Sequence, residues 1–335
     1  MKNTIKHALI LFIIFTIPSE CFAGLGITLS KHNEEIDNSL KAIIRQYNNK
    51  IMQSIKTNDS TYIFELLTDE SKKQKGKKDE IEKSIEQLKK IINENDFQVY
   101  NEYYWSRKGI GEGRCMIASE TDDEFVISLN CDSNHVFVSL LTSSGGFKDY
   151  MLGIVYVKIE NEWQLYTYRL GLFKIAGKSA LEWATEINNL YKKGHLIPAA
   201  LRLSVIKPCI KPVIFFRYSR EQEILDLCKK VQIEVSQKFT FPISLSDIKG
   251  TPIIHSIQPQ FVKMKILPMV WYVTSHSLDD TKSLQNEVDL MTPKIEEMFM
   301  GISDEVSHIL FKAFTELPTD PQKAYNNYGL GVKVN

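Results

Sequence analysis

Residues 161–179 read NEWQLYTYRLGLFKIAGKS, and this stretch decides between two folds. Its last three residues, Gly177-Lys178-Ser179, match the end of a phosphate-binding loop, which would predict a nucleotide enzyme. That motif also requires a glycine at position 172, where the chain has Leu172. Phosphate is held by the backbone N–H groups of a glycine-rich turn, whereas residues 172–175 are apolar and stiff. The stretch therefore predicts a closing strand, and Ser179 is expected to cap the helix that follows, with Glu182 completing a capping box.

The residues before this strand predict an α+β domain that covers residues 24–176. Apolar residues recur at helical spacing between Ile36 and Ile55 and again between Ile81 and Ile92, with a short helix at 61–67 between them. β-branched and aromatic runs then predict antiparallel strands at 97–105, 114–120, 124–130, 135–141 and 151–159. Helices followed by a set of strands are typical of the α+β class.

The closing hairpin carries a resemblance to a known superfamily. In VYVKIENEWQLYTYRL, residues 155–170, a polar turn is followed by Trp163, Leu165, Tyr166 and Tyr168. Together with the helices, this hairpin resembles the nuclear-transport-factor-two-like (cystatin-like, cone-shaped) superfamily from residue 34 to residue 175. The resemblance is architectural, because the superfamily has no invariant motif, and the hairpin at 115–131 is longer than its simplest members need. It implies a pocket between sheet and helices, which some members use for proton transfer and many others for binding.

The resemblance also suggests which side chains would serve that pocket. The weak candidates for proton transfer are Tyr104, His135 and Asp149. A catalytic base needs burial or a charged partner to bring its pKa near the working pH, and the sequence pairs none of the three with such a partner. The side chains expected to line the pocket are Tyr103, Trp105, Trp163, Tyr166, Tyr168 and Arg169. The alternatives are a surface position for His135 and core positions for Tyr166 and Tyr168. A homodimer through the outer sheet face would use Tyr100, Tyr104 and Tyr156.

The second half of the chain predicts two further parts and resembles no family. Residues 177–212 are expected to form a helical hairpin connector, and residues 213–335 a smaller α+β domain. Its helices are predicted at 221–237, 283–300 and 303–316, and its strands at 239–245, 251–257, 260–274 and 328–334.

The N-terminus predicts export. Two lysines precede an apolar run at 8–17, Pro18 ends the run, and small residues lead up to Ala23. We expect a signal peptide at 1–23, cleaved after Ala23, and a mature protein in the periplasm or outside the cell. A lipid anchor on Cys21 is the alternative, although Pro18 is a poor neighbour for that modification. No later stretch has 18 uninterrupted apolar residues, so no transmembrane segment is expected in the mature chain.

Four cysteines remain after cleavage, and an even number in an exported protein predicts disulfides. The expected bridges are Cys115–Cys131, across a hairpin, and Cys209–Cys228, with four buried thiols as the alternative. No CxxC motif supports a redox or zinc site. The histidines are scattered, and HSLDD at 276–280 is interpreted as a loop that caps the next helix. No metal and no cofactor are therefore expected.

The charge balance and the absence of certain motifs narrow the range of possible functions. The chain has 41 basic and 41 acidic side chains, and this balance argues against a nucleic-acid partner. No Gly-x-Ser-x-Gly elbow supports a serine hydrolase. We therefore favour a non-catalytic ligand-binding or protein-interaction protein of the periplasm or cell envelope. The alternatives are a hydrolase or isomerase that uses a polar pocket in the cone domain, and a secreted effector or secretion accessory protein.

Overall fold

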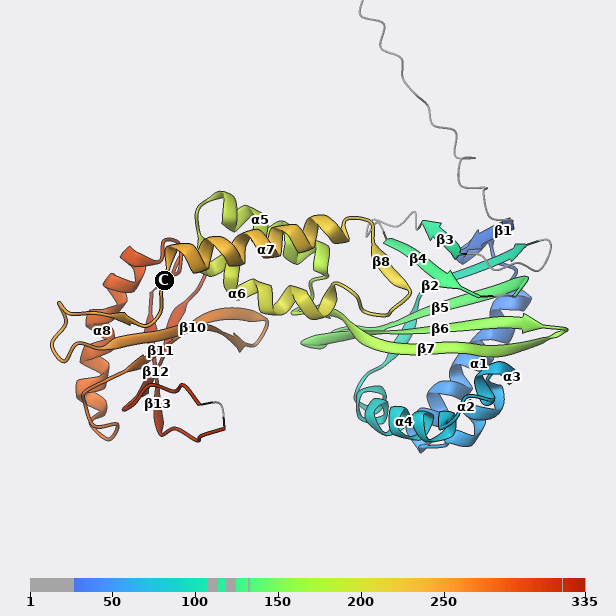
Figure 1. The fold of residues 1–335 in the computed structure, drawn as a ribbon, viewed down its shortest axis with the longest axis horizontal. Helices are drawn as coiled ribbons and strands as arrows, with labels where there is room; N and C mark the ends of the chain where they lie inside the picture. Colours follow the sequence, from blue (N-terminus) through green and yellow to red (C-terminus); the bar gives the residue numbers. More distant parts are fainter. Residues whose placement is uncertain (1–26, 108–113, 119–124, 132, 321, 335) are drawn as a thin grey trace, which may run out of the picture.

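The computed structural model describes residues 27–107, 114–118, 125–131, 133–320 and 322–334, so the expected signal peptide lies outside the described residues. The described residues form two lobes of helices packed on sheets, joined by a bundle of helices (Figure 1). The predicted α+β class is confirmed. No helix in this described part is long and apolar enough to cross a bilayer.

The N-terminal lobe is built on a five-stranded sheet in the order β1-β2-β5-β6-β7, and every neighbouring pair is antiparallel. The strands are β1 (Ile27–His32), β2 (Phe97–Arg107), β5 (His135–Ser143), β6 (Lys148–Ile159) and β7 (Glu162–Ile175). The turn at 160–162 and the strand end near Gly177 lie where the sequence predicts them. Ser179 and Glu182 form the predicted capping box, each bonding the other's backbone N–H.

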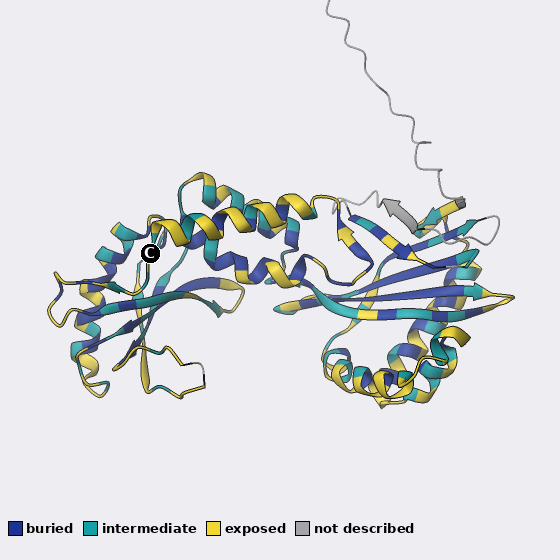
Figure 2. Cartoon of the chain, viewed as in Figure 1, coloured by how far each residue is buried: buried dark blue, intermediate teal, exposed yellow. Residues whose placement is uncertain are grey.

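Helices cover one face of this sheet: α1 (Asn38–Thr57), α2 (Ser60–Leu66), α3 (Asp69–Lys72) and α4 (Lys77–Glu94). The carboxylate of Asp37 accepts from the N–H groups of Ser39 and Leu40, and Asn58 ends α1 in the left-handed conformation. These caps satisfy backbone groups that a helix leaves unpaired at its ends. The apolar stripes of α1 and α4 are buried against the sheet, and the opposite helix faces are exposed (Figure 2).

The other face of the sheet is also covered. A three-stranded sheet, in the order β3-β4-β8, lies over it (Figure 1). β3 (Arg114–Ala118) and β4 (Phe125–Asn130) are the predicted hairpin, and β8 (Phe216–Tyr218) comes from much later in the chain. The expected domain boundary at residue 213 therefore needs correction, because β8 belongs to the N-terminal lobe.

The connector consists of α5 (Ala180–Lys192), α6 (Leu196–Ile206) and the short 3-10 helix η3 (Lys207–Cys209), and α7 (Glu221–Lys238) packs against it. The C-terminal lobe has a sheet in the order β13-β12-β11-β10-β9, with α8 (Thr281–Met298) beside it. Its strands are β9 (Ile243–Ser244), β10 (Ile253–Val262), β11 (Lys265–Val273), β12 (His308–Phe314) and β13 (Asn327–Lys333).

One expected helix of this lobe is a strand. Residues 308–314, which fall in the helix predicted at 303–316, form β12 between β11 and β13. Ile309, Phe311 and Ala313 are fully buried, at the period of two that a strand requires. β11 and β12 run parallel, and α8 supplies the crossover that this pairing needs.

Candidate functional site

The six side chains expected to line a cone pocket do not meet. Tyr103 and Trp105 are buried in the core that faces the β3-β4-β8 sheet, whereas Trp163 and Tyr168 are buried under the helices on the opposite face. Tyr166 packs against the first of these cores and donates a hydrogen bond to the carbonyl of Asn130 at 2.6 Å. Arg169 is exposed and donates to the backbone carbonyl of Tyr168.

Side chains of the chain itself fill the space between sheet and helices. At its centre, the buried Tyr156 hydroxyl donates to Asn48 at 2.8 Å, and the Asn48 amide donates to the Ser139 hydroxyl at 3.0 Å. Burial raises the pKa of Tyr156 well above its usual value, because a phenolate there would lose its hydration. This tyrosine is therefore a core residue with a satisfied hydroxyl, and it is neither a proton carrier nor the dimer contact that the sequence suggested.

Two of the three proton-transfer candidates lie together. The Tyr104 hydroxyl and His135 Nδ1 are 2.9 Å apart, and their rings are parallel. Burial raises the pKa of Tyr104, which makes it a poor base. Asp149 lies on β6 at the opposite end of the sheet, where the Gly146 N–H donates to its carboxylate at 3.2 Å. Burial raises the pKa of Asp149, against the opposing effects of Gly146 and Lys174. The three candidates therefore form no single catalytic group.

The cysteines differ from expectation. Cys209 and Cys228 are both buried free thiols, so the predicted bridge between them is absent. Burial raises the pKa of the Cys209 thiol to about 12, which makes it unreactive near neutral pH. Cys115 pairs with Leu129 in the hairpin register, two residues before Cys131, and the predicted Cys115–Cys131 bridge stays a prediction. The side chain of Cys115 itself lies outside the described residues.

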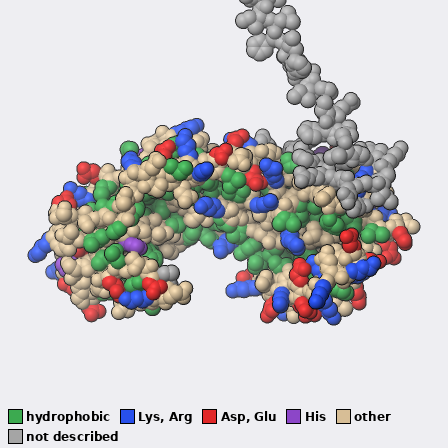
Figure 3. Space-filling model, in the orientation of Figure 1, with side chains coloured by type: hydrophobic (Ala, Val, Ile, Leu, Met, Phe, Trp, Pro, Cys, Tyr) green, Lys and Arg blue, Asp and Glu red, His purple; other side chains and the backbone are tan. Residues whose placement is uncertain are grey.

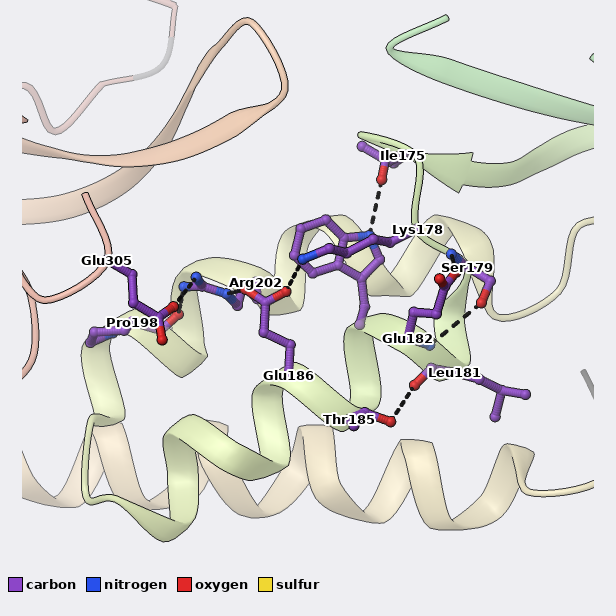
Figure 4. A network of polar contacts seen from close by, with 11 residues as sticks. Ile175, Lys178, Ser179, Leu181, Glu182, Thr185, Glu186, Pro198, Arg202 and Glu305 are labelled. Carbon is purple, nitrogen blue, oxygen red and sulfur yellow. Dashed lines mark hydrogen bonds and ion pairs between the residues drawn. The ribbon is translucent and has the colours of Figure 1, made fainter. Parts of the chain in front are cut away.

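A charged cluster that the sequence analysis missed lies where the connector meets both lobes (Figure 4). Glu186 on α5 accepts from Lys178, which follows β7, and from Arg202 on α6. Arg202 also donates to the Pro198 carbonyl at 2.9 Å and to Glu305 of the C-terminal lobe at 3.3 Å. The Arg202 side chain is only 10% exposed, so its charge depends on these partners. We call these five residues the junction cluster.

The junction cluster should make stability depend on acidity. Burial opposes ionisation of Glu186, but Lys178 and Arg202 outweigh it and hold the pKa of Glu186 below the usual 4.5. A group with a lowered folded-state pKa stabilises the fold above its unfolded pKa, and this contribution disappears as the pH falls through the folded value. We expect the urea midpoint of the wild-type protein to fall more between about pH 5 and pH 3 than that of Glu186→Gln. Parallel curves for the two proteins would contradict this assignment.

A groove lies beside β8 in the N-terminal lobe. It has a volume of about 450 Å³ and is lined by Val126, Ser128, Lys211, Ile214, Phe215, Arg217, Tyr218 and Ser219. Ile214 is 63% exposed, the largest exposed fraction of any large hydrophobic residue in the described part of the chain. Arg217 is paired at 3.6 Å with Glu221, whereas Lys211 has no ion pair with any described residue. The groove thus combines an exposed apolar side chain with a net positive charge.

Two glycines position this groove. A Cβ at Gly153 on β6 would strike the Phe215 ring, and a Cβ at Gly171 on β7 would overlap the Pro212 carbonyl. Their absent side chains let residues 212–215 lie directly on the large sheet. Phe216 then stacks on Phe125 with ring centres 4.3 Å apart, and β8 joins β4.

A second opening lies between α5 and α7. Its volume is about 440 Å³, and its lining comes from Leu181, Ala184, Thr185, Asn188, Arg220, Glu223, Ile224 and Leu227. Arg220 and Glu223 pair with each other at 2.9 Å, so this opening has no charge left to select a partner. Among the residues that the structure describes, no three His, Cys, Asp or Glu side chains are grouped as metal ligands.

Comparison with protein-family models, curated proteins and solved structures finds no match for this chain.

Proposed function

We propose that the protein is an exported, non-catalytic interaction protein that binds an acidic, partly apolar segment of another protein. The groove beside β8 carries the proposal. An exposed apolar patch with a polar rim is typical of an interaction surface. Here the apolar contact is Ile214, and Lys211 supplies a positive charge that no described acidic side chain neutralises.

The interior of the N-terminal lobe supports binding at the surface over catalysis within. The Tyr156, Asn48 and Ser139 side chains occupy the region where a cone-shaped domain would hold a small ligand. The Tyr104–His135 pair is separated from Asp149 by the length of β5 and β6, so it lacks the carboxylate that would orient an imidazole base. Membership of the cone-shaped superfamily remains part of the proposal, and it rests on helices packed on an antiparallel sheet that ends in the β6–β7 hairpin.

The groove can be tested in the cells that make the protein. A photo-crosslinking residue at position 214 should form a covalent adduct with one defined partner. The same residue at position 290 is the matched control, since Leu290 on α8 is 60% exposed and lies in the other lobe. We expect no adduct from position 290. Equal adducts from both positions, or none from position 214, would contradict the proposal.

The charge of the groove gives a second prediction. Lys211→Glu should reduce the yield of the position 214 adduct at least about tenfold, because like charges facing each other oppose association. Lys249→Glu, on an exposed loop of the C-terminal lobe, should leave the yield unchanged. An undiminished yield from Lys211→Glu would contradict the proposal that the partner segment is acidic.

A further inference from the structure

The C-terminal lobe contains a buried carboxylate whose oxygens make no hydrogen bond of ordinary geometry within the described part of the chain. The Glu287 side chain, on the inner face of α8, is 1% exposed. A buried ionised carboxylate without partners costs several kcal/mol, so such a group is normally paired, protonated or bound to a cation. The position of Glu287 therefore needs an explanation that packing does not supply.

Three polar side chains lie close to Glu287. His276 Nε2 lies 3.8 Å from Glu287 Oε1. The Tyr272 hydroxyl is buried and interacts with Glu287, and burial, followed by this charged neighbour, raises its pKa. Ser275 comes from the same loop as His276, and a Cβ built at Gly250 would lie 2.7 Å from its hydroxyl and 3.6 Å from Glu287 Oε1. The His276 imidazole and the Tyr272 hydroxyl thus lie beside the Glu287 carboxylate, and the Ser275 hydroxyl lies near it on the side where Gly250 has no Cβ.

The separation of the imidazole and the carboxylate favours an ion between them. A distance of 3.8 Å is too long for a hydrogen bond. It is shorter than about 4.1 Å, the sum of two metal–ligand bonds of the length that zinc makes to histidine and carboxylate. One ion can therefore contact both atoms with little movement of either. His276 is 34% exposed and offers the path from solvent, while Glu287 is sealed inside.

We propose that His276 and Glu287 bind a divalent transition-metal cation, with the Tyr272 and Ser275 hydroxyls and water in its remaining positions. An imidazole beside a carboxylate selects zinc-like ions over calcium and magnesium, which prefer oxygen ligands alone. The ion ties the loop after β11 to α8. The backbone of that loop is already fixed, because the His276 N–H donates to the Thr274 hydroxyl at 3.0 Å and Asp280 caps α8. The sequence HSLDD suggested only the cap, since the second ligand lies eleven residues beyond His276.

Zinc titration of the full chain, followed by calorimetry and by thermal unfolding, tests the site. The wild-type protein should bind one equivalent of zinc, show no heat with calcium, and unfold at a higher temperature when zinc is present. His276→Gln and Glu287→Gln should each weaken binding more than tenfold and abolish the zinc-dependent rise. The controls His255→Gln and His308→Gln should retain both effects.

The variants still test the proposal if the substitutions alter the stability of the metal-free protein. Glu287→Gln keeps the shape of the side chain and removes the buried charge, so we expect this variant to fold and to unfold no lower than the metal-free wild type. Absence of zinc binding by the wild-type protein would overturn the proposal. Retention of tight binding by either His276→Gln or Glu287→Gln would also overturn it, because the zinc would then be elsewhere.

Discussion

Replacement of Arg202 by methionine is expected to lower the free energy of unfolding by about 3–5 kcal/mol, the usual cost of removing one partner from a buried ion pair. Methionine keeps much of the apolar length of the side chain but removes every donor. Glu186, whose side chain is 21% exposed, would then keep only Lys178 as a partner. The Pro198 carbonyl would lose its bond to Arg202 as well. Denaturation by urea, monitored by tryptophan fluorescence, measures this loss.

The chain offers a matched control on a neighbouring helix. Arg220 forms a pair with Glu223, but both side chains are more than half exposed. Arg220→Met should therefore change the free energy of unfolding by no more than about 0.5 kcal/mol, as expected for a surface pair. The double variant Arg202→Met/Glu186→Gln should recover part of the stability, since it leaves no uncompensated buried charge. Equal losses from Arg202→Met and Arg220→Met would show that the junction cluster has no special role.

The loss at Arg202 also bears on the arrangement of the two lobes. Lys178, Glu186 and Arg202 join β7 to the connector, and Glu305 reaches the same arginine from the C-terminal lobe. Glu305 is half exposed, so this last contact contributes little by itself. A second contact supports it, because the Phe147 ring of the N-terminal lobe lies 4.9 Å from the Phe261 ring at the tip of the β10–β11 hairpin. Figure 3 shows the resulting shape, with a hollow below the bridge between the lobes.

Local signals in the sequence were sufficient for part of this fold. The helices α1 and α4 have a regular apolar stripe, and the β6–β7 hairpin has strands of alternating pattern around a polar turn. The capping box of Ser179 and Glu182 lies within four residues. Each of these elements is specified by neighbours in the chain, which is why a single sequence predicts it.

Long-range pairing decided the elements that were missed. β8 has three residues, and only its pairing with β4, some ninety residues earlier, makes it a strand. The apolar residues of 303–316 fit a helix about as well as a strand, and the edges of β11 and β13 decide the matter. A sequence without its partners does not contain that information.

The residues predicted to line a pocket do not meet, and the reason is related. The expected pocket assumed that the aromatic residues of β2 and β7 point to the same face. A register shift between β6 and β7 leaves Tyr166 as an extra residue on β7, so Tyr166 packs against one core while Trp163 and Tyr168 pack against the other. Both faces are also covered, so aromatic side chains on either one are core residues. The groove beside β8 and the pair His276–Glu287 were missed because each is assembled from segments that are far apart in the chain or on different elements.

Replacement of Gly171 by alanine is the second large effect that we expect. The new Cβ would overlap the Pro212 carbonyl, and neither the strand β7 nor the backbone after η3 can move away without breaking its own contacts. Overpacking of this kind costs about 1–3 kcal/mol, and the involvement of backbone on both sides places Gly171→Ala near the upper end. Gly329→Ala on β13 is the control, since its Cβ would meet nothing within 4 Å and alanine favours an extended strand slightly more than glycine does. Equal urea midpoints for the two variants would contradict the close contact.

Gly171→Ala also distinguishes an effect on stability from an effect on the proposed interaction. Pro212 begins the segment that presents Ile214 to the groove, so a shift at Gly171 must move the groove even in a protein that remains folded. We therefore expect Gly171→Ala to reduce the adduct from position 214 at temperatures where the variant is still fully native by circular dichroism. Gly329→Ala should leave the adduct unchanged, because β13 lies in the other lobe. If Gly171→Ala lost stability but kept the full adduct, binding would not depend on how residues 212–215 lie on the sheet, and the groove would no longer explain the partner's recognition.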